Sequence, residues 1–379
     1  MSSVFFISLM NGDPWGGSEE AWYHTALYAA ANGYKVACAA YDWPQKENRF
    51  LNLEKAGCTV YRLSNKGHLK RSVLEKITHK ITKREVKRYV HSLPFNDYDI
   101  TVINLGLFEM ESPYWKDFYT VLKNYALLYH NYVVGQKFSS SKSIVLKNWI
   151  LHSKHNLFDS KRIQYYLEEQ LGIKVPNADT LHNPVTFEQP GQLTPYPPLQ
   201  QEDYIFVMLA ALDTFRKAQD KLLLALSGEN WKNRNWQLHL YGDGKDKEML
   251  NKLIHQNGLE KKVFLKGHTS QVKEVLHKTH LLLQITHIDA MPLSVVEALS
   301  MSRPVIVSNV GDMPDWVNDG VNGWICNAVT IEGINAILEK AWAKKENWNK
   351  MGEQSFSIFQ KKFPANSSAY LLKQLGVHY

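Results

Sequence analysis

The chain has 379 residues, of which 44% are hydrophobic and 21% are charged, and its formal net charge is +7. This length exceeds what one hydrophobic core supports and fits two domains, and the composition is that of a globular protein and not of a disordered one. No apolar run reaches the ~20 residues of a transmembrane helix, and three scattered cysteines exclude both a disulfide framework and a cysteine-based metal site.

The first half of the chain alternates predicted strands with predicted helices. The stretch from Val4 to Met10 has no basic leader of the kind that begins a signal peptide, so we expect a first strand and a cytoplasmic protein. A loop with the adjacent glycines Gly16 and Gly17 follows, and then a helix to Ala31. Backbone N–H groups at such glycines can approach a ligand closely, although most Gly-Gly pairs are only turns. The further strands predicted in this half are 35–40, 58–63, 100–105, 126–130, 149–153 and 179–182.

The segment from Lys66 to Arg88 carries nine basic and two acidic residues, so its excess equals the net charge of the whole chain. Leucine, isoleucine and valine recur within it at helical spacing, which predicts a basic amphipathic helix or pair of helices. Such a charge run is usually a solvated face of a domain. It also suits an anionic membrane surface, where each basic residue contributes about 1 kcal/mol. Nucleic acid is disfavoured as a partner, because no binding module or aromatic-basic interleaving accompanies the charge.

The second half restarts the alternation after a segment rich in Pro and Gln. We expect an α/β fold of two doubly wound, Rossmann-like domains, residues 1–185 and 204–359, with a cleft between them. Residues 186–203 are the predicted linker, and the segment 360–379 is expected to pack back on the first domain. The strands predicted in this half are 204–212, 236–241, 263–266, 280–285 and 304–309, and the helices are 218–226, 244–256, 270–277, 331–344 and 369–375.

Two carboxylates, Asp289 and Glu297, stand eight positions apart around a predicted helix start. Pro292 suits the first turn of a helix, where its missing N–H costs nothing. The free N–H groups of Leu293 and Ser294 would then point out of the helix at the carboxyl end of a parallel strand, which is a common site for anions. The pattern predicts a pocket for a phosphate-linked sugar. A glutamate that only complements a helix dipole is the alternative explanation.

Several stretches together resemble the retaining glycosyltransferases of family 4, which have two Rossmann-like domains in the GT-B arrangement. The matching stretches, in chain order, are GGSEEAW, HNPV, ALDTFRKAQDKLLLAL, LHLYGDG, VFLKGH and DAMPLSVVEALSMSRPVIVSNVGDMPDWVNDGVNGW. The resemblance implies transfer of a sugar from a nucleotide diphosphate sugar to an acceptor, with retained anomeric configuration and with neither a metal nor a cofactor. The leaving diphosphate would then be neutralised by cations and by helix N-termini.

The resemblance also implies roles for individual residues. Lys217 would hold the diphosphate, Asp289 would touch the donor sugar, and Glu297 would bind the ribose hydroxyls. His130, at the end of a predicted strand, would lie near the reacting sugar. The catalytic residues implied are therefore Lys217, Asp289 and His130. The donor-binding residues implied are Gly16, Gly17, Arg216, Gly242, Gly267, His268, Met291, Pro292, Leu293, Ser294 and Glu297.

Two positions depart from the family pattern. Asp289 replaces the usual glutamate, which keeps the charge but shortens the side chain by one methylene. Ala211 stands where the family usually has an arginine, so one of two diphosphate cations is missing. A lost charge-assisted contact of this kind is worth on the order of 1.5–3 kcal/mol. Arg216 could replace it, or could be a solvated surface arginine.

Three hypotheses of function follow. The first is an active retaining transferase for surface polysaccharide, with a glycan or lipid-linked acceptor and with Lys66 to Arg88 on the inner face of the plasma membrane. The second, motivated by Ala211, is a catalytically weakened homologue that binds a nucleotide sugar or a partner transferase. The third is an epimerase or phosphorylase on the same architecture, and it is disfavoured because neither an acid/base set nor a pyridoxal lysine can be assigned.

Overall fold

A computed structural model describes residues 2–10, 15–63, 88–105, 115–130, 137–198 and 203–377. The chain divides into two compact units, and each is described here by itself. Unit 1 is Met1–Pro184 together with Asn366–Tyr379, and unit 2 is Val185–Ala365. The basic segment from Lys66 lies outside the described residues up to position 87, and its last residue, Arg88, is exposed.

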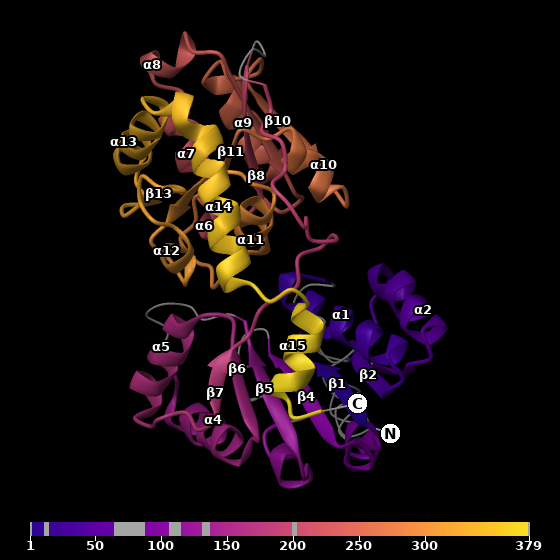
Figure 1. The fold of residues 1–379 in the computed structure, drawn as a ribbon. Helices are drawn as coiled ribbons and strands as arrows, with labels where there is room; N and C mark the ends of the chain where they lie inside the picture. The colour runs from indigo at the N-terminus through magenta and orange to yellow at the C-terminus, as the bar shows by residue number, and fades with distance from the viewer. Residues whose placement is uncertain are drawn as a thin grey trace. The chain divides into compact units, whose positions relative to one another are not determined.

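Unit 1 is built on a parallel sheet of seven strands among the residues described (Figure 1). Parallel strands are covered on both faces and therefore read as continuous apolar runs, and all six residues of β1 and of β4 are buried. In the order of the sheet, the strands are β3 (Thr59–Leu63), β2 (Lys35–Tyr41), β1 (Ser3–Ser8), β4 (Ile100–Leu105), β5 (Tyr125–Tyr129), β6 (His155–Phe158) and β7 (Ala178–Thr180).

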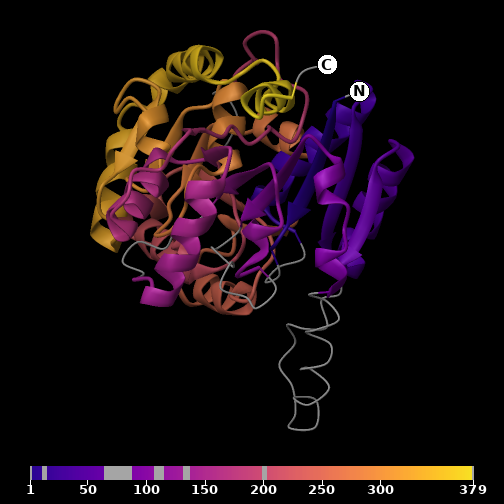
Figure 2. The same cartoon turned by 90° about the horizontal axis from the view of Figure 1, so that it is seen from below.

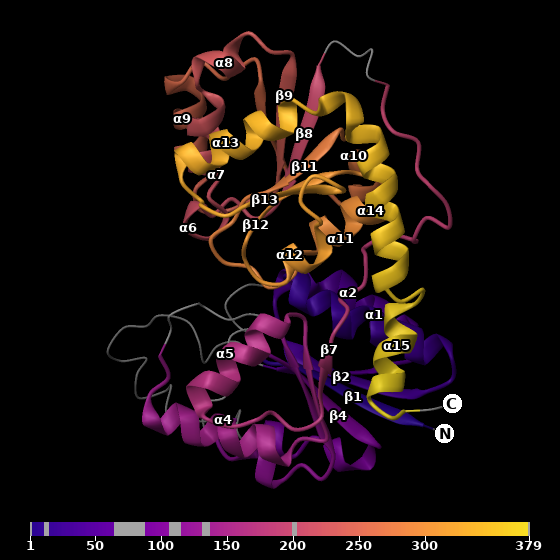
Figure 3. The same cartoon turned by 60° about the vertical axis from the view of Figure 1, so that its left-hand side comes forward.

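Helices cover both faces of this sheet, with α4 and α5 on one side and α1 and α15 on the other (Figure 3). The C-terminal helix α15 packs against α1, so the end of the chain returns to the unit that begins it (Figures 1 and 2). The helices of unit 1 are α1 (Gly17–Ala31), η1 (Pro44–Lys46), α2 (Glu47–Lys55), η3 (Phe95–Asp97), η5 (Phe118–Thr120), α4 (Ser140–His152), α5 (Lys161–Leu171) and α15 (Ser367–Gln374).

Unit 2 repeats this design with a six-stranded parallel sheet. In the order of the sheet, its strands are β10 (Val263–Gly267), β9 (Trp236–Tyr241), β8 (Tyr204–Leu209), β11 (Leu281–Gln284), β12 (Val305–Ser308) and β13 (Gly323–Cys326). Its helices are α6 (Thr214–Lys217), α7 (Gln219–Leu226), α8 (Glu229–Lys232), α9 (Lys247–Gln256), α10 (Val272–His277), α11 (Leu293–Ser300), α12 (Met313–Trp316), α13 (Ile331–Trp342), η6 (Lys345–Asn347) and α14 (Trp348–Lys362).

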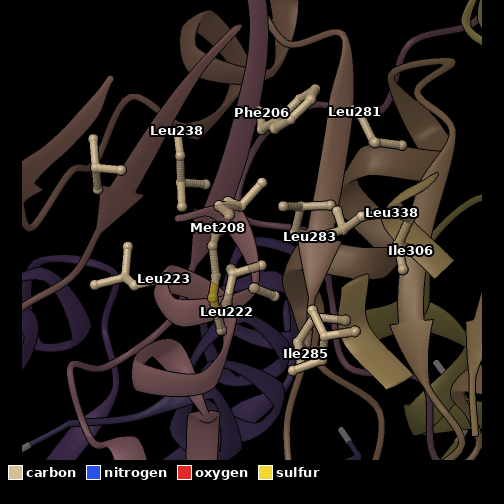
Figure 4. Packing of buried hydrophobic residues seen from close by; sticks show 14 of the residues in the cluster. Phe206, Met208, Leu222, Leu223, Leu238, Leu281, Leu283, Ile285, Ile306 and Leu338 are labelled. Carbon is tan, nitrogen blue, oxygen red and sulfur yellow. The ribbon is translucent and has the colours of Figure 1, made fainter. Parts of the chain in front are cut away.

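A hydrophobic core packs one face of the unit 2 sheet against several helices, among them α7 and α13 (Figure 4). Alternate residues of neighbouring strands, among them Phe206 and Met208 of β8, meet leucines of α7 and α13 there. Each fully buried side chain of this size stabilises the fold by roughly 1.5–3 kcal/mol relative to exposure. The other residues of this core that Figure 4 labels are Leu222, Leu223, Leu238, Leu281, Leu283, Ile285, Ile306 and Leu338.

Local capping explains where several helices begin and end. The Ser160 hydroxyl accepts the N–H of Ile163 at the start of α5, and Gly172 ends that helix in the left-handed region at φ 60°. Thr330 caps α13 in the same way, through the N–H of Gly333. These capping residues therefore set the start of α5 and of α13 and the end of α5.

One predicted element needs correction, and two observed elements were missed. The strand predicted at 149–153 is wrong, because residues up to His152 belong to α4 and the strand β6 follows it. A short apolar run does not distinguish the two, and here Trp149 and Ile150 share a helical face with Val145 and Leu146. Strand β13 and the helix α14 were not predicted.

The predicted linker is not a separate segment as far as it is described, because residues from Val185 onward belong to unit 2. Thr194 N–H donates to the Ser302 hydroxyl at 3.1 Å, and the Tyr196 hydroxyl donates to the His280 carbonyl at 2.8 Å. The prolines of this segment thus run along the surface of unit 2. In the described parts of the chain, no helix combines the length and the apolarity needed to cross a bilayer.

Candidate functional site

The candidate site lies where the strand order of unit 2 reverses, between the neighbouring strands β8 and β11. Ligands of open parallel sheets bind outside the carboxyl ends of the strands at such a switch point. Lys217 follows β8 and Asp289 follows β11. The Lys217 ammonium nitrogen lies 2.5 Å from Asp289 Oδ2, and their side chains are 14% and 13% exposed.

Lys217 is the last residue of the short helix α6, and features at both ends of this helix fix its position. At its start, the backbone N–H and the hydroxyl of Thr214 donate to Asp246 Oδ2 at 2.7 and 2.9 Å. At its end, Ala218 takes a left-handed conformation, φ 49°, which few residues other than glycine adopt and which costs on the order of 1–3 kcal/mol. This turn separates α6 from α7 and leaves Lys217 at the edge of the sheet.

The loop that carries Asp289 is bound directly to α6. The Arg216 carbonyl accepts three hydrogen bonds from it, from the Thr286 hydroxyl at 2.6 Å and from the N–H groups of His287 and Ile288 at 2.7 and 3.3 Å. The ammonium and the carboxylate are therefore fixed relative to each other by backbone contacts as well as by their own ion pair.

A polar side chain in β11 links Asp289 to the next helix. Gln284 is 1% exposed, and its amide donates to Asp289 Oδ2 at 3.3 Å and accepts from the Ser294 hydroxyl at 3.2 Å. The sequence interpretation overlooked this residue. The sequence did contain an indication of its role, because Gln284 is the single polar residue in the apolar run LLLQI and a buried polar side chain needs hydrogen-bond partners.

Helix α11 presents unbonded backbone donors next to this pair. Pro292 is its N-cap residue, with extended backbone at φ −66° and ψ 133°, and not a residue of its first turn as predicted. No side chain caps α11, and within the described structure no acceptor is found for the backbone N–H of Leu293 or Ser294. Unsatisfied N–H groups and the helix dipole favour an anion at this point.

Glu297 lies one turn further along α11 and is 3% exposed. Its Oε1 accepts the backbone N–H of Thr186 at 3.0 Å and the Thr186 hydroxyl at 2.6 Å. Thr186 directly follows the HNPV stretch, so this carboxylate ties the first residues of unit 2 to α11. The sequence interpretation did not include Thr186.

Glycines let the surrounding loops approach each other closely. A Cβ atom on Gly242, whose φ is 139°, would lie 2.0 Å from the Ala210 carbonyl oxygen. Gly242 N–H donates to the Gly267 carbonyl at 2.9 Å, and the N–H of His268 donates to Asp243 Oδ2 at 3.2 Å. The predicted residues Gly242, Gly267 and His268 thus lie together at the carboxyl ends of β9 and β10.

The Arg216 side chain is 43% exposed but has a protein partner, so it is more than the solvated surface arginine of the alternative interpretation. Its Nε donates to Asp213 Oδ2 at 2.8 Å, and the Lys245 ammonium lies 3.4 Å from the other oxygen of Asp213. Burial raises the pKa of the Asp213 carboxyl, but the hydrogen bonds from Arg216 and Lys245 outweigh it and lower that pKa. Ala211 is exposed, and its backbone carbonyl accepts a hydrogen bond from the Gln219 side-chain amide.

The remaining predicted residues belong to unit 1. Gly16 is the N-cap of α1 and Gly17 its first residue. The φ of Gly16 is −158°, which any residue adopts, and a Cβ there would meet Met10 at 3.8 Å, an ordinary contact. Nothing described inside unit 1 therefore requires a glycine at position 16. His130 is 3% exposed at the end of β5, with its Nε2 2.6 Å from Asn104 Oδ1.

The structure thus brings Lys217, Asp289, Gln284 and Ser294 together in unit 2, close to the start of α11. Gly16, Gly17 and His130 lie at the carboxyl edge of the other sheet, in unit 1. In the described ranges no three His, Cys, Asp or Glu side chains gather as a metal site.

Comparison with known proteins finds a family match within the second unit. Residues 195–357 match the family model of glycosyl transferases group 1. The chain is 29% identical over 126 residues to the poly(glycerol-phosphate) alpha-glucosyltransferase of Bacillus subtilis, a match that covers 33% of this chain and 19% of that protein. It is 26% identical over 165 residues to the lipopolysaccharide 1,6-galactosyltransferase of Salmonella typhimurium, covering 41% of this chain and 45% of that protein. The matches span less than half the length of these curated relatives.

The fold extends the similarity to the whole chain. Anabaena HepE, solved in complex with UDP, superposes with a TM-score of 0.72 at 15% identity, covering 99% of this chain and 100% of that one. The two parallel α/β units have the fold of GT-B glycosyltransferases, and the predicted fold class is confirmed.

Proposed function

On the premise that residues 195–357 match the group 1 glycosyl transferases, we propose that this chain transfers a sugar from a nucleotide diphosphate sugar to an acceptor. The bond between the sugar C1 and the diphosphate oxygen breaks, a bond from C1 to an acceptor hydroxyl oxygen forms, and the hydroxyl proton leaves with the diphosphate or to solvent. The observation that carries the proposal is the Lys217–Asp289 pair beside the open start of α11.

The reaction requires stabilisation of the negative charge that develops on the leaving diphosphate. The donors proposed to stabilise this charge are the Lys217 ammonium and the backbone N–H groups of Leu293 and Ser294. Arg216 and Lys245 flank the same edge on Asp213 and can add positive potential in place of the arginine missing at Ala211. No metal enters this scheme, and metal independence is part of the proposal.

The two carboxylates are proposed to hold hydroxyl groups. Asp289 accepts from the donor sugar, and its position is set by Lys217 and Gln284. Glu297 accepts from the ribose of the nucleotide, with Thr186 fixing one of its oxygens. Retention of the anomeric configuration is proposed from the resemblance of DAMPLSVVE to the retaining transferases of family 4.

The acceptor is proposed to be a glycan or a lipid-linked glycan of the cell surface. The two relatives named above act, by their names, on poly(glycerol-phosphate) and on lipopolysaccharide. The basic segment Lys66 to Arg88 supports a location on the cytoplasmic face of an anionic membrane.

The test is release of nucleoside diphosphate from a panel of UDP-, GDP- and ADP-sugars, followed by mass spectrometry of products with glycan acceptors. We expect slow hydrolysis of one donor without acceptor, and the loss of that hydrolysis in Lys217→Met. A matched control is Lys340→Met, since Lys340 also forms an ion pair, with Asp319, but on α13. No release from any donor would contradict the proposal.

A second candidate function is nucleotide-sugar binding without turnover, which Ala211 favours because a diphosphate cation is missing there. Ala211→Arg separates the two. A gain in turnover of roughly tenfold or more, the worth of one charge-assisted contact, would indicate a weakened site. An unchanged rate in an active wild type would indicate that Arg216 or Lys245 already supplies the charge.

A further inference from the structure

A buried polar network connects the carboxyl ends of the central strands of unit 1. Glu19 and Lys46 are both fully buried and form an ion pair at 3.2 Å. Glu19 Oε1 also accepts the Ser8 hydroxyl at 2.9 Å, and its Oε2 accepts the indole N–H of Trp22 and the Asn104 amide, the latter at 3.5 Å. The charge of Glu19 is therefore balanced inside the protein.

The Glu19 carboxylate sets the orientation of the Asn104 amide. A carboxylate only accepts hydrogen bonds, so the amide must direct its NH₂ group toward Glu19 and its oxygen away from it. That oxygen lies 2.6 Å from His130 Nε2. An amide oxygen cannot donate, and His130 Nε2 therefore carries a proton.

The second ring nitrogen of His130 faces another carboxylate. Nδ1 lies 3.3 Å from Asp159 Oδ2, and the two side chains are 2% and 6% exposed. Asn183 donates its amide to the same oxygen at 3.4 Å. With its proton on Nε2 alone, the ring would direct the lone pair of Nδ1 at a carboxylate. A proton between these groups belongs to the imidazole, because ordinary pKa values are about 6.5 for histidine and 3.9 for aspartate.

We infer that Asn104, oriented by Glu19, and Asp159 together hold His130 as an imidazolium, so that His130 acts as a fixed positive charge and not as a proton acceptor. The charge state is a property of unit 1 and is independent of any activity, whereas its use in sugar transfer rests on the proposed function. Nε2 is at hydrogen-bond distance of the Asn104 oxygen and Nδ1 is at ion-pair distance of Asp159, so the contribution that we infer for His130 is its charge. Asn104 and Asp159 are thus positioning residues for it.

The charged groups facing the imidazole come from three elements. Asp159 follows β6 and contacts the ring, while Glu19 of α1 and Lys46 of η1 lie behind Asn104 of β4. The described members of the network form two ion pairs, Glu19 with Lys46 and Asp159 with the proposed imidazolium, whose charges compensate each other. A network that only stabilised the fold would not need a particular protonation state at His130.

Nitrogen NMR of the full chain, labelled with ¹⁵N-histidine, tests the inference directly. His130→Gln assigns the signals. At pH 7.5 we expect both ring nitrogens of His130 to show the N–H type of resonance, although a solvent-exposed histidine of ordinary pKa, about 6.5, would be mostly neutral there. A pyridine-type nitrogen on His130 in the wild type at this pH would overturn the inference.

Two variants test the positioning residues. Asp159→Asn should give a neutral ring with the pyridine-type resonance, because its amide can donate to Nδ1. Asn104→Leu removes the acceptor of Nε2–H and should weaken proton retention at least tenfold. Asn156→Leu is the matched control, since Asn156 is a fully buried asparagine whose side-chain oxygen accepts a hydrogen bond from the Tyr129 hydroxyl, and in the described part of the chain it makes no hydrogen bond to the imidazole. An effect of Asn156→Leu on His130 as large as that of Asn104→Leu would contradict the assigned roles.

Turnover gives an independent second readout. With any donor found active, Asp159→Asn should lower kcat at pH 7.5 by tenfold or more with KM within twofold, and lowering the pH to 5.5 should restore part of it by protonating the ring. A loss that acid does not restore would contradict a role for the charge in transfer. If no donor is turned over, the proposed function fails while the NMR result still decides the charge state.

Discussion

Lys217 and Asp289 are 72 positions apart in the sequence, yet the ammonium nitrogen of one lies 2.5 Å from a carboxylate oxygen of the other. Each follows one of the two neighbouring strands at the point where the strand order of unit 2 reverses. The pair places a cation beside the open N–H groups of α11, where the Asp289 carboxylate holds it.

Removal of the Lys217 ammonium should reduce turnover more than it reduces stability. A charge-assisted contact to a diphosphate is worth on the order of 1.5–3 kcal/mol, so we expect Lys217→Met to lower kcat/KM by roughly 10- to 150-fold. Steady-state kinetics with the active donor measure this. Lys340→Met should leave the rate within twofold, and an equal loss in both variants would argue against a specific role for Lys217.

Two glycines should respond differently to alanine. Gly16→Ala should fold normally, because its φ and the space around it suit any residue, but should weaken donor binding if the Gly16 loop covers the diphosphate. Gly242→Ala should destabilise unit 2, since its Cβ would lie 2.0 Å from a backbone oxygen at φ 139°.

Thermal unfolding and calorimetric titration with nucleoside diphosphate separate these two effects. Normal unfolding with undiminished binding in Gly16→Ala would show that the Gly16 loop is only a turn, and the proposed contact would be withdrawn.

Arg303 should be a major stabilising residue of unit 2, although no carboxylate among the described residues pairs with it. It is fully buried, and its guanidinium donates to the carbonyls of Leu276, His277 and Pro195 at 2.7, 3.1 and 2.8 Å. Burial lowers the pKa of this arginine to about 10. Arg303→Met would leave several buried carbonyls without donors, each worth about 1–3 kcal/mol.

We expect Arg303→Met to lower the free energy of unfolding by at least 3 kcal/mol, measured with a chemical denaturant. Arg234→Met is the control, because Arg234 pairs with Glu339 at a partly exposed position and should contribute no more than about 1 kcal/mol. A loss under 1 kcal/mol in Arg303→Met would contradict this account.

Stability should fall with acid partly because of His280. This side chain is 1% exposed and accepts the N–H of Ile205 at its Nδ1, and burial lowers its pKa to about 4. The unfolded chain binds a proton at about pH 6.5, whereas the folded one does not until about pH 4. The contribution is therefore complete above pH 6.5 and is lost as the pH falls from 6.5 to 4.

Between pH 8 and pH 5, protonation of His280 in the unfolded chain should lower the free energy of unfolding by about 1–2 kcal/mol. Denaturant unfolding of the wild type and of His280→Asn at several pH values checks it, because the variant keeps an acceptor but does not titrate. Parallel pH curves for the two proteins would show that His280 does not contribute.

The strands and the first turn of α11 were predictable because they depend on local pattern. Apolar runs predicted eleven strands of the two sheets within a few residues, and Asp289 and Ser294 were predicted as neighbours at one helix start. The strand wrongly predicted at 149–153 and the missed helix α14 show the limit of this method. A short apolar run and a mixed amphipathic run are both compatible with more than one element until their partners are known.

The sequence by itself determined the fold class, the two-domain organisation and the identity of the chemical groups, since these depend on hydrophobic periodicity and on motifs a few residues long. Only the tertiary structure decided which groups meet: Gln284 with Asp289, Thr186 with Glu297, and Asn104 with both Glu19 and His130. Apart from Gln284 and Asp289, which are five positions apart, these contacts join residues at least 26 positions apart in the chain. Strand order and burial therefore set the partners and the charge of each group, and neither can be read from residue spacing.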